Sequence, residues 1–530
     1  MNTVPLGPFL GVSNKLPESA LHTDKGDYLR SAPDVLIDSA GRLRSIDALV
    51  LAQEAPGAHS LFMMSDTDGY VVRSGVMYAI TLPAYTETLF KVLSTDAPVS
   101  YRRIGDDLFY SNGTDSGRVT GGLWYPLGLP TPDAPICSAI NGTLYAGSYQ
   151  ASVSYFNETT GEEGGTSPST VSEFPGIGGL RVSLPPAIVG ATHVNVYLSP
   201  VNGSIPLLAR KVSAGTQYVD FVEPQTSYGR QITGRIESPL PAGDLFESNG
   251  RLCSISGETV YVGLPYKHGY YEPAKGFISF LSPVTMAVAN EGGTYIAADK
   301  TYFIPGDLGN IQEKMTDALP YGAVRGTAFE HPNKKNVGWF SQDGFVLADT
   351  VGQAVAITAD MIAVTPPERG FSAIINQGSA VTVSSCGWTL NLDNNTVTEN
   401  SYALTSFSRG FGTTTNGIVR LDTDNAQAGY ANFGKLDFGT DRVKHLPNVY
   451  VGASAVDSLV LTVSYADERD RLLEYEYVAR SSSENLRMQR YDVGRGIRST
   501  WFELTLSNQD GQKFELASVS FAPTASQRRI

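Results

Sequence analysis

Apolar and polar residues alternate in short runs along this chain, and glycine-containing turns separate the runs. The pattern is clearest in 245–304, where β-branched and aromatic residues recur in runs of four or five. The strands predicted there are 245–248, 251–255, 259–262, 277–280, 284–288, 294–297 and 301–304. Asn249-Gly250 suits a type I′ hairpin, because both of its central residues need a positive φ. The stretch therefore predicts a meander of short antiparallel strands.

Asn-Gly and Asp-Gly dipeptides extend the hairpin pattern over the whole chain. They begin at Asp68, Asn112, Asn141, Asn202, Asn249, Asp343, Asn416 and Asp510. The spacing favours units of roughly 30 to 45 residues, the size of a four-stranded propeller blade. We therefore predict an all-β chain with a β-propeller of about six or seven blades. None of the four tryptophans precedes an aspartate, so the Trp-Asp signature of a WD40 array is absent.

Changes in the pattern of strand-like runs and turn residues divide the chain into five predicted parts. They are an N-terminal arm (1–41), two propeller parts (42–149 and 223–430), an inserted module (150–222) and a C-terminal β-sandwich (431–530). The last part carries long alternating strands and is large enough for an independent sandwich. A short helix over 466–473, a charged and proline-free segment, remains an alternative there.

The N-terminal arm combines prolines with apolar residues. Its prolines are Pro5, Pro8, Pro17 and Pro33. Prolines block regular pairing, whereas a disordered tail would carry fewer apolar side chains. We expect a segment with little regular structure that lies across a surface of its own domain or of a neighbour. Its removal is then expected to spare the melting temperature of the isolated chain and to impair its assembly with neighbouring subunits.

The segment 150–222 does not follow the spacing of strands and turns that predicts the blades. It offers the strands 153–156, 180–184, 194–198 and 218–221, a turn at Gly161-Glu162 and a stop at Ser167-Pro168. This resembles a fibronectin type III module inserted into a propeller loop, where extra length costs little entropy. The alternative is that this segment forms two further hairpins of the propeller blades. Excising 151–221 would distinguish an inserted module from a part of the blades.

Composition and charge narrow the function classes. At 530 residues the chain is too long for one core, and its net charge is −14 with a pI near 5.0. No Lys/Arg cluster suited to a phosphate backbone occurs, so nucleic-acid binding is not expected, although DNA could pass as cargo along an acidic conduit. No run of 18 apolar residues predicts a membrane span, and the start does not predict a secretory signal.

Cysteine and histidine positions do not predict a metal site or a disulfide framework. Cys137, Cys253 and Cys386 are far apart and odd in number, so we expect buried free thiols in a reducing cytoplasm. The histidines are scattered, at His22, His59, His193, His268, His331 and His445. Asp66-Thr67-Asp68-Gly69 lacks the later carboxylate of a calcium loop, and turn chemistry explains it. We predict no metal and no cofactor.

A search for catalytic groups finds no placed acid, base or nucleophile. Neither a Gly-x-Ser-x-Gly elbow nor a sialidase box occurs, and the glycine-rich pieces at 176–179 and 410–412 do not join a strand to a helix. Neighbouring carboxylates, Asp106-Asp107 and Glu162-Glu163, would point to opposite faces of a strand and are interpreted as solvated. Positive charge near the end (Arg495, Arg498, Arg528 and Arg529) suits a solvated face or an ion pair between subunits. We predict no enzymatic activity.

Several short segments stand out together: 7–17, 25–30, 38–44, 249–252 with 260–261, and 501–529. Together they resemble the β-propeller structural proteins of the tail tip or nozzle of tailed bacteriophages. The resemblance extends over most of the chain in its general sequence pattern. It implies a virion tail component, synthesised in the host cytoplasm, that assembles around the tail axis with copies of itself and other tail proteins. The inserted module is also in keeping with phage tails, which carry such modules as decoration.

Two other function classes remain open. One is a receptor-binding tail protein that recognises a host glycan or surface filament, with Tyr266, Tyr270 and Tyr271 near Lys267 and His268 as an aromatic platform. Those aromatic residues could equally lie in an interface or a core. The other is a propeller hydrolase, which the missing acid/base pair disfavours. Binding to host envelope would indicate the first class, and glycan turnover would indicate the second.

Overall fold

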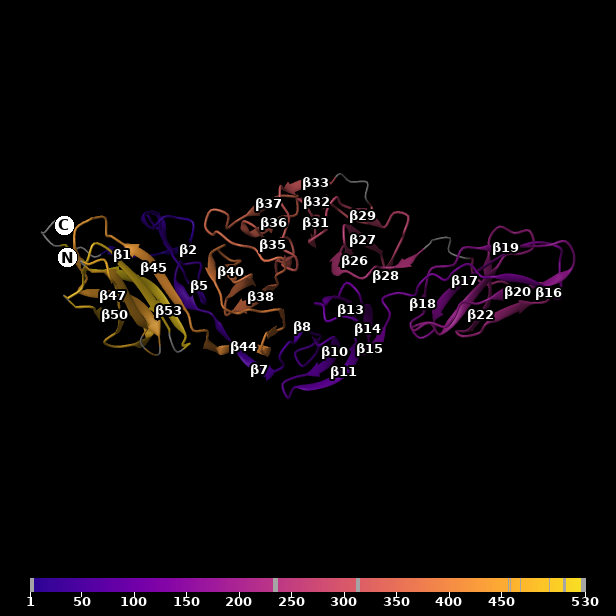
Figure 1. Cartoon of the computed structure of the whole chain (residues 1–530), viewed down its shortest axis with the longest axis horizontal. Coiled ribbons are helices and arrows are strands. Elements are labelled where there is room, and N and C mark those ends of the chain that lie inside the picture. The colour runs from indigo at the N-terminus through magenta and orange to yellow at the C-terminus, as the bar shows by residue number, and fades with distance from the viewer. Residues whose placement is uncertain are drawn as a thin grey trace. The chain divides into compact units, whose positions relative to one another are not determined.

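The computed structural model describes residues 4–231, 237–310, 315–455, 457, 459–467, 469–494, 496–508 and 511–525. In these residues the chain is all-β apart from one 3-10 turn, η1, at Glu18–Ala20. Contacts divide it into two compact units, one made of Met1–Val92 with Ala318–Ile530 and the other of Leu93–Asp317. Figure 1 shows the strands of both.

Four antiparallel sheets of four strands each are found in the described part of the first unit, besides its C-terminal sandwich. The first is β8 (His59–Met63), β9 (Asp68–Arg73), β10 (Val76–Thr81) and β11 (Thr86–Val92). The second is β34 (Phe329–Glu330), β35 (Val337–Ser341), β36 (Gly344–Ala348) and β37 (Ala354–Ala356). The third is β38 (Ser372–Gln377), β39 (Ala380–Ser385), β40 (Trp388–Asn391) and β41 (Val397–Glu399). The fourth is β42 (Ser406–Ser408), β43 (Phe411–Thr414), β44 (Gly417–Ala426) and β7 (Asp47–Glu54), so its outer strand comes from the start of the chain.

Three comparable sheets belong to the second unit. One is β12 (Ser100–Ile104), β13 (Asp107–Ser111), β14 (Ser116–Thr120) and β15 (Leu123–Tyr125). The next is β24 (Ser238–Pro239), β25 (Asp244–Ser248), β26 (Arg251–Ser256), β27 (Thr259–Leu264), β28 (Lys267–Tyr271) and β29 (Phe277–Ser279). The last is β30 (Met286–Asn290), β31 (Gly293–Ala297), β32 (Thr301–Pro305) and β33 (Thr316–Leu319).

First strands of successive sheets contact one another within each unit. In the first unit β8 contacts β42, β42 contacts β38, and β38 contacts β34. In the second, β12 contacts β25 and β25 contacts β30. Sheets that meet along their first strands and carry their later strands outward have the radial arrangement of propeller blades.

Serine and threonine hydroxyls join these first strands. Ser406 Oγ accepts the backbone N–H of Leu61 at 2.8 Å, in the first unit. In the second, Ser100 Oγ accepts the N–H of Leu245 at 3.0 Å and donates to its carbonyl at 3.2 Å. The first strand of a sheet has one unpaired edge, and its buried backbone groups need partners. Small hydroxyl residues supply them where adjacent strands come too close for larger side chains.

The inserted module forms its own two-sheet sandwich in the second unit. One sheet is β16 (Cys137–Leu144), β20 (Gly178–Ser183) and β23 (Tyr218–Phe221). The other is β17 (Gly147–Asn157), β18 (Glu162–Glu163), β19 (Thr170–Phe174), β21 (His193–Leu198) and β22 (Leu207–Ser213). Residues from both sheets, among them Val153, Val182 and Val196, share one core. The sandwich therefore begins at Cys137, before the predicted boundary at residue 150.

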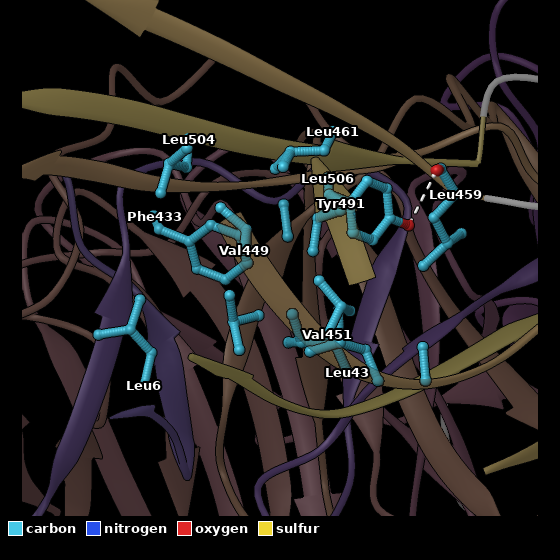
Figure 2. Packing of buried hydrophobic residues seen from close by; sticks show 14 of the residues in the cluster. Leu6, Leu43, Phe433, Val449, Val451, Leu459, Leu461, Tyr491, Leu504 and Leu506 are labelled. Atoms are coloured by element: carbon cyan, nitrogen blue, oxygen red, sulfur yellow. Dashed lines mark hydrogen bonds between the residues drawn. The ribbon is translucent and has the colours of Figure 1, made fainter. Parts of the chain in front are cut away.

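The C-terminal sandwich is built from both ends of the chain. Its first sheet is β5 (Val35–Ile37), β6 (Leu43–Ser45), β53 (Phe514–Phe521), β47 (Asn448–Ala455) and β50 (Ser483–Asp492), with β1 (Val4–Leu6) on β53. Its second sheet is β45 (Tyr430–Leu436), β52 (Phe502–Ser507), β48 (Val460–Ala466) and β49 (Leu472–Val478). A small sheet of β46 (Lys444–His445), β51 (Arg498–Ser499) and β54 (Thr524–Ala525) adjoins them. Figure 2 shows Leu6 and Leu43 in one core with Phe433, Val451 and Leu504.

The N-terminal arm contradicts the expectation of little regular structure. Besides β1 and β5 it holds β2 (Phe9–Val12), β3 (His22–Thr23) and β4 (Gly26–Leu29), and β2 pairs with β4 in parallel. Phe9, Val12 and Leu29 are buried in the core of the C-terminal sandwich. Pro5 lies in β1, an edge strand, where a missing N–H leaves no partner unpaired. The surface under the arm belongs to the same chain.

The strands predicted within 245–304 correspond to β25, β26, β27, β29, β30, β31 and β32. They are divided between two sheets instead of forming one meander. β28 is a further strand, between the predicted strands 259–262 and 277–280, where no strand was predicted. The helix considered for 466–473 is wrong, since β48 ends at Ala466, β49 begins at Leu472, and the described residues between them form the turn that joins this antiparallel pair.

Most of the Asx-Gly dipeptides lie at turns between strands. Those at Asn112, Asn249, Asp343 and Asn416 join successive strands of one sheet, and Asn202 lies in the loop after β21. Asp68 instead begins β9, and Asn141 lies inside β16, where the register of pairing shifts. Asp510 lies outside the described residues.

Candidate interaction surfaces

The aromatic platform predicted around β28 is not an exposed surface. Tyr266 is 98% exposed in the turn before the strand, but Tyr270 is fully buried, and its OH accepts the N–H of Leu129 at 2.6 Å. Tyr271 is half-buried with its ring against Tyr261, 5.0 Å between centroids. Because side chains of a strand alternate between faces, neighbouring tyrosines cannot all point to solvent.

Lys267 and His268 are also engaged within the unit. Lys267 forms an ion pair with Glu237, and its ammonium lies 4.5 Å from the centre of the Tyr270 ring. The His268 ring lies edge-on to Phe109, 5.8 Å between centroids. Burial lowers the pKa of His268 despite the attraction of Asp107. Lys267 and His268 therefore connect β28 to Glu237, just before β24, and to Phe109 on β13.

A buried ion pair links the inserted sandwich to the sheet that precedes it. Arg118 on β14 donates to Glu162 on β18 at 2.9 Å, and each side chain is only 12% exposed. Burial, with the nearby negative charge of Glu162, raises the pKa of the Tyr270 hydroxyl well above its ordinary value. The prediction of a solvated Glu162 is therefore wrong. A strand pattern shows alternation but not what packs on each face.

Glu163 is the centre of a second polar network inside the inserted sandwich. Its Oε1 accepts hydrogen bonds from Ser154 Oγ at 2.5 Å, Asn195 Nδ2 at 2.9 Å and Tyr197 OH at 2.5 Å. Arg230 pairs with its other oxygen. Glu163 is thus bonded and not solvated, which corrects the prediction for this residue too. Ser154 and Asn195 occupy regular polar positions of alternating strands, so the sequence carried no distinct signal for this network.

Other residues considered for chemistry lie apart. Asp68 accepts hydrogen bonds from Thr67 Oγ1 at 2.7 Å and Ser65 Oγ at 3.1 Å within one turn, and Asp107 accepts one from Thr120 at 2.5 Å. The part of the chain that the structure describes holds no cluster of three or more potential metal ligands. Nor does any helix in it reach the length and hydrophobicity of a membrane span. Of the four arginines near the end, only Arg498 is described, on β51; Arg495, Arg528 and Arg529 lie outside the described residues.

The cysteines are free thiols with different surroundings. Cys253 is fully buried, and burial raises its pKa to about 12. Cys137 and Cys386 are only half-buried, so the prediction of burial holds for one thiol of three. Burial also raises the pKa of both. A thiol with a raised pKa is a poor nucleophile at neutral pH.

An open groove of about 470 Å³ lies in the first unit, between the C-terminal sandwich and the β38–β39 turn. Its lining includes Arg44, Asp47, Gln377 and Lys513. Arg44 donates to the Gln377 carbonyl at 2.8 Å, and the Gln377 side chain accepts the N–H of Asp47 at 2.8 Å. Burial raises the pKa of Asp47, and Lys513, 3.8 Å away, opposes that rise. The polar groups of the groove mainly bind one another.

The most exposed strands of the C-terminal sandwich are β49 and β50. β49 ends the second sheet and β50 ends the first, and among the described residues no strand pairs with their outer edges. They contact each other across a short connection, 479–482, so both edges lie on one side of the sandwich. Apolar side chains that are 47–68% exposed lie along them: Leu472, Tyr475, Val478, Leu486 and Met488. We call this surface the open edge.

No protein-family model and no curated protein matches the chain. Solved structures are similar in fold at low identity. The WD40 β-propeller domain of Doa1 is 10% identical, with a TM-score of 0.35 over 71% of this chain and 95% of that one. Hsv2 of Kluyvelomyces marxianus is 13% identical, with a TM-score of 0.21 over 56% and 92%. The chain is an all-β protein with neighbours of WD40 and β-propeller type, although it lacks the Trp-Asp signature.

Proposed function

We propose that this chain is a non-enzymatic structural component of a bacteriophage tail, at the tip, baseplate or nozzle. It assembles there around the tail axis with copies of itself and with other tail proteins. The phrases that resemble tail-tip and nozzle proteins support the proposal, and they include the segment 38–44, which contributes to β6. The open edge is the observation that carries it.

The open edge has the physical character of an assembly surface. An unpaired strand edge presents a row of backbone donors and acceptors that a further strand can satisfy. Soluble monomers usually protect such edges with short strands, prolines or covering segments. Here two edges of seven and ten residues stand on one side of the same sandwich, and exposed apolar side chains accompany them. Such a surface suits a protein whose role is to hold neighbours.

We propose in addition that the seven sheets outside the two sandwiches are the blades of one propeller. Sheets of four to six strands that meet along their first strands within each unit support this proposal. We further propose that the inserted sandwich is of fibronectin type III kind. In support, β16 pairs with β20, while β17 pairs with β21 and β21 with β22, which matches the B–E and C–F–G pairings of immunoglobulin-like sandwiches.

Receptor binding is a second candidate, because one end of the inserted sandwich exposes apolar residues on its turns. Tyr145 is 60% exposed between β16 and β17, and Ile177 is 74% exposed just before β20. Leu144 pairs with Gly178, which places the two turns together. Loops at the end of such a sandwich are a common position for recognition. In this candidate function the turns contact a glycan or a surface filament of the host.

Purified particles of the virus that encodes this chain provide the test. Mass spectrometry is expected to find the chain in mature particles, and a label on it is expected at the distal tail in electron micrographs. Particles produced without it are expected to have incomplete tails. Its absence from particles with normal tails would overturn the proposal. Binding of host envelope that a Tyr145→Ala, Ile177→Ala variant loses would add the receptor role.

A further inference from the structure

His268 on β28 lies against one face of the sheet β12–β15. Its ring is edge-on to Phe109 on β13, with 5.8 Å between centroids, and Phe109 is directly opposite Arg118 on β14. Residues directly opposite on neighbouring strands point to the same face, so Arg118 stands on the face that His268 covers. Asp107, two residues before Phe109 on β13, is also on that face. One cation and one carboxylate of this face therefore act on the imidazole.

The Nδ1 atom of His268 is buried, and it forms no hydrogen bond with any residue that the structure describes. A neutral imidazole carries one N–H, whereas a protonated imidazole carries one on each nitrogen. Protonation therefore places an N–H on Nδ1, where it is a buried donor without an acceptor, and that is unfavourable. Asp107 already accepts a hydrogen bond from Thr120 at 2.5 Å. Lys267, the next charge on β28, is paired with Glu237.

The ion pair of Arg118 and Glu162 joins this face to the inserted sandwich through a single hydrogen bond. Arg118 donates to Glu162 Oε2 at 2.9 Å, and both side chains are largely buried. Arg118 Nε and Glu162 Oε1 are also buried, and neither forms a hydrogen bond within the described residues. A guanidinium and a carboxylate can form two parallel hydrogen bonds, and that arrangement is the stronger one. A displacement of Arg118 therefore breaks the whole pair.

We propose that His268 makes the junction between the inserted sandwich and the sheet β12–β15 sensitive to acid. A proton on the imidazole adds a second positive charge beside Arg118, at a place where burial makes the repulsion stronger than in water. The repulsion displaces Arg118 from Glu162, and the inserted sandwich then moves more freely against the sheet. The inference is independent of the proposed function, because it concerns only contacts within this chain.

The direction of this pH dependence follows from the pKa of His268. Burial lowers that pKa most, Asp107 opposes the effect, and Arg118 adds to it. The native state therefore takes up this proton less readily than the unfolded state does. The stabilising contribution is fully present above pH 6.5, the ordinary pKa of histidine, and it is lost as pH falls through the lowered native pKa. Because one proton is involved, the opening equilibrium changes by at most about tenfold per pH unit.

Hydrogen exchange of the full chain, followed by mass spectrometry from about pH 8 to about pH 5 and corrected for the intrinsic effect of pH, tests the proposal. Exchange in β14 and β18 is expected to increase as pH falls in the wild type, and His268→Gln is expected to abolish the increase. His331→Gln is the matched control, because burial also lowers the pKa of His331 but this residue lies in the first unit. It should respond like the wild type. An unchanged response in His268→Gln, or none in the wild type, would overturn the proposal.

Asp107→Asn gives a second measurement in a chain that keeps His268. It removes the charge that favours the imidazolium but keeps an oxygen that can accept from Thr120. The increase in exchange is therefore expected to begin at a lower pH than in the wild type. Nuclear magnetic resonance of the histidine side chains, assigned with His268→Gln, should show the titration midpoint of His268 below 6.5 and lower still in Asp107→Asn. A midpoint of His268 at or above 6.5 contradicts the proposal, whichever way the exchange responds.

Discussion

The C-terminal sandwich takes strands from both ends of the chain, whereas the inserted sandwich takes all its strands from one continuous segment. In the first, β1, β5 and β6 complete a sheet with β53, and their apolar residues share its core. In the second, β16 to β23 supply every buried residue of the core except Leu129, and the links to the rest of the unit include polar contacts such as Arg118–Glu162. The N-terminal strands are therefore part of the C-terminal sandwich, whereas β16 to β23 form a sandwich from one stretch of chain.

Removing a polar contact and removing an apolar strand are expected to destabilise the protein in different ways. Removing apolar strands from a shared core leaves cavities and exposed surface, and the loss grows with every buried side chain. Removing one partner of a buried ion pair leaves a single uncompensated charge. The first loss spreads through the sandwich, while the second stays at the junction.

Deleting residues 1–37 is expected to have the largest effect. The deletion removes buried residues including Leu6, Phe9, Val12, Leu29 and Ile37 from one core. Each contributes about 2–4 kcal/mol, so the five together contribute about 10–20 kcal/mol, as much as the roughly 5–15 kcal/mol that stabilises a whole domain. We expect the C-terminal sandwich to unfold, which calorimetry and limited proteolysis would detect. This replaces the expectation from sequence that the arm can be removed without loss of stability.

A deletion of residues 1–3 only is the control for that experiment, because β1 begins at Val4. It should melt like the full chain. If the longer deletion melts at the same temperature as this control, the core shown in Figure 2 does not depend on the N-terminal strands.

Arg118→Ala is expected to act locally at the junction. It leaves the Glu162 carboxylate buried without its cation, which costs about 3–5 kcal/mol. Arg181→Ala is a matched control within the same module, since its ion pair with Asp220 is more exposed and contributes at most about 1 kcal/mol. Urea unfolding gives the difference, and hydrogen exchange should place it around β18. Equal costs for the two variants would mean that the junction is not set by this pair.

Excising the inserted sandwich is expected to have a smaller effect on the remaining sheets. Its entry and exit are close, since Thr131 Oγ1 donates to the carbonyl of Glu237 at 2.9 Å. Joining these residues by a short linker removes residues 132–236 as one piece, whereas an excision of 151–221 would cut through β17. The cost of the new loop is about 1 kcal/mol or less. A cooperative melt of the shortened chain is the expected result, and insolubility would show that the module is part of the propeller core.

A substitution of Asp34 is expected to have the smallest effect on stability, and this effect depends on pH. It is buried between the N-terminal strands and Ser401, and burial with the nearby Glu399 raises its pKa despite a hydrogen bond from the Ser401 N–H at 2.9 Å. The native state then holds this proton more tightly than the unfolded state, so the contribution of Asp34 to stability rises as pH falls from above the raised pKa toward 3.8. Asp34→Asn should lose this slope. Urea midpoints across that range, with the exposed Asp424→Asn as the control, would detect it.

Much of the local structure of this chain was predictable from its sequence. Side-chain alternation has a period of two that comes from strand geometry itself, so it predicts strands such as β25, β26 and β31 within a residue or two. Asx-Gly dipeptides predict turns because few residues accept positive φ there, and Asn249-Gly250 is such a turn. The same dipeptide failed at Asn141, where pairing with β20 draws the segment into a strand.

Only the tertiary structure decided which strands are neighbours. The alternation of side chains does not predict that β7 pairs with β44, or that β1 pairs with β53. Many strands have equivalent edges, and which edges pair depends on packing between segments that are hundreds of residues apart. For the same reason Glu162 and Tyr270 look like surface residues in the sequence and are enclosed in the fold. The open edge is also a property of the assembled sandwich, since the sequence of β49 is that of an ordinary strand until the fold leaves its outer side unpaired.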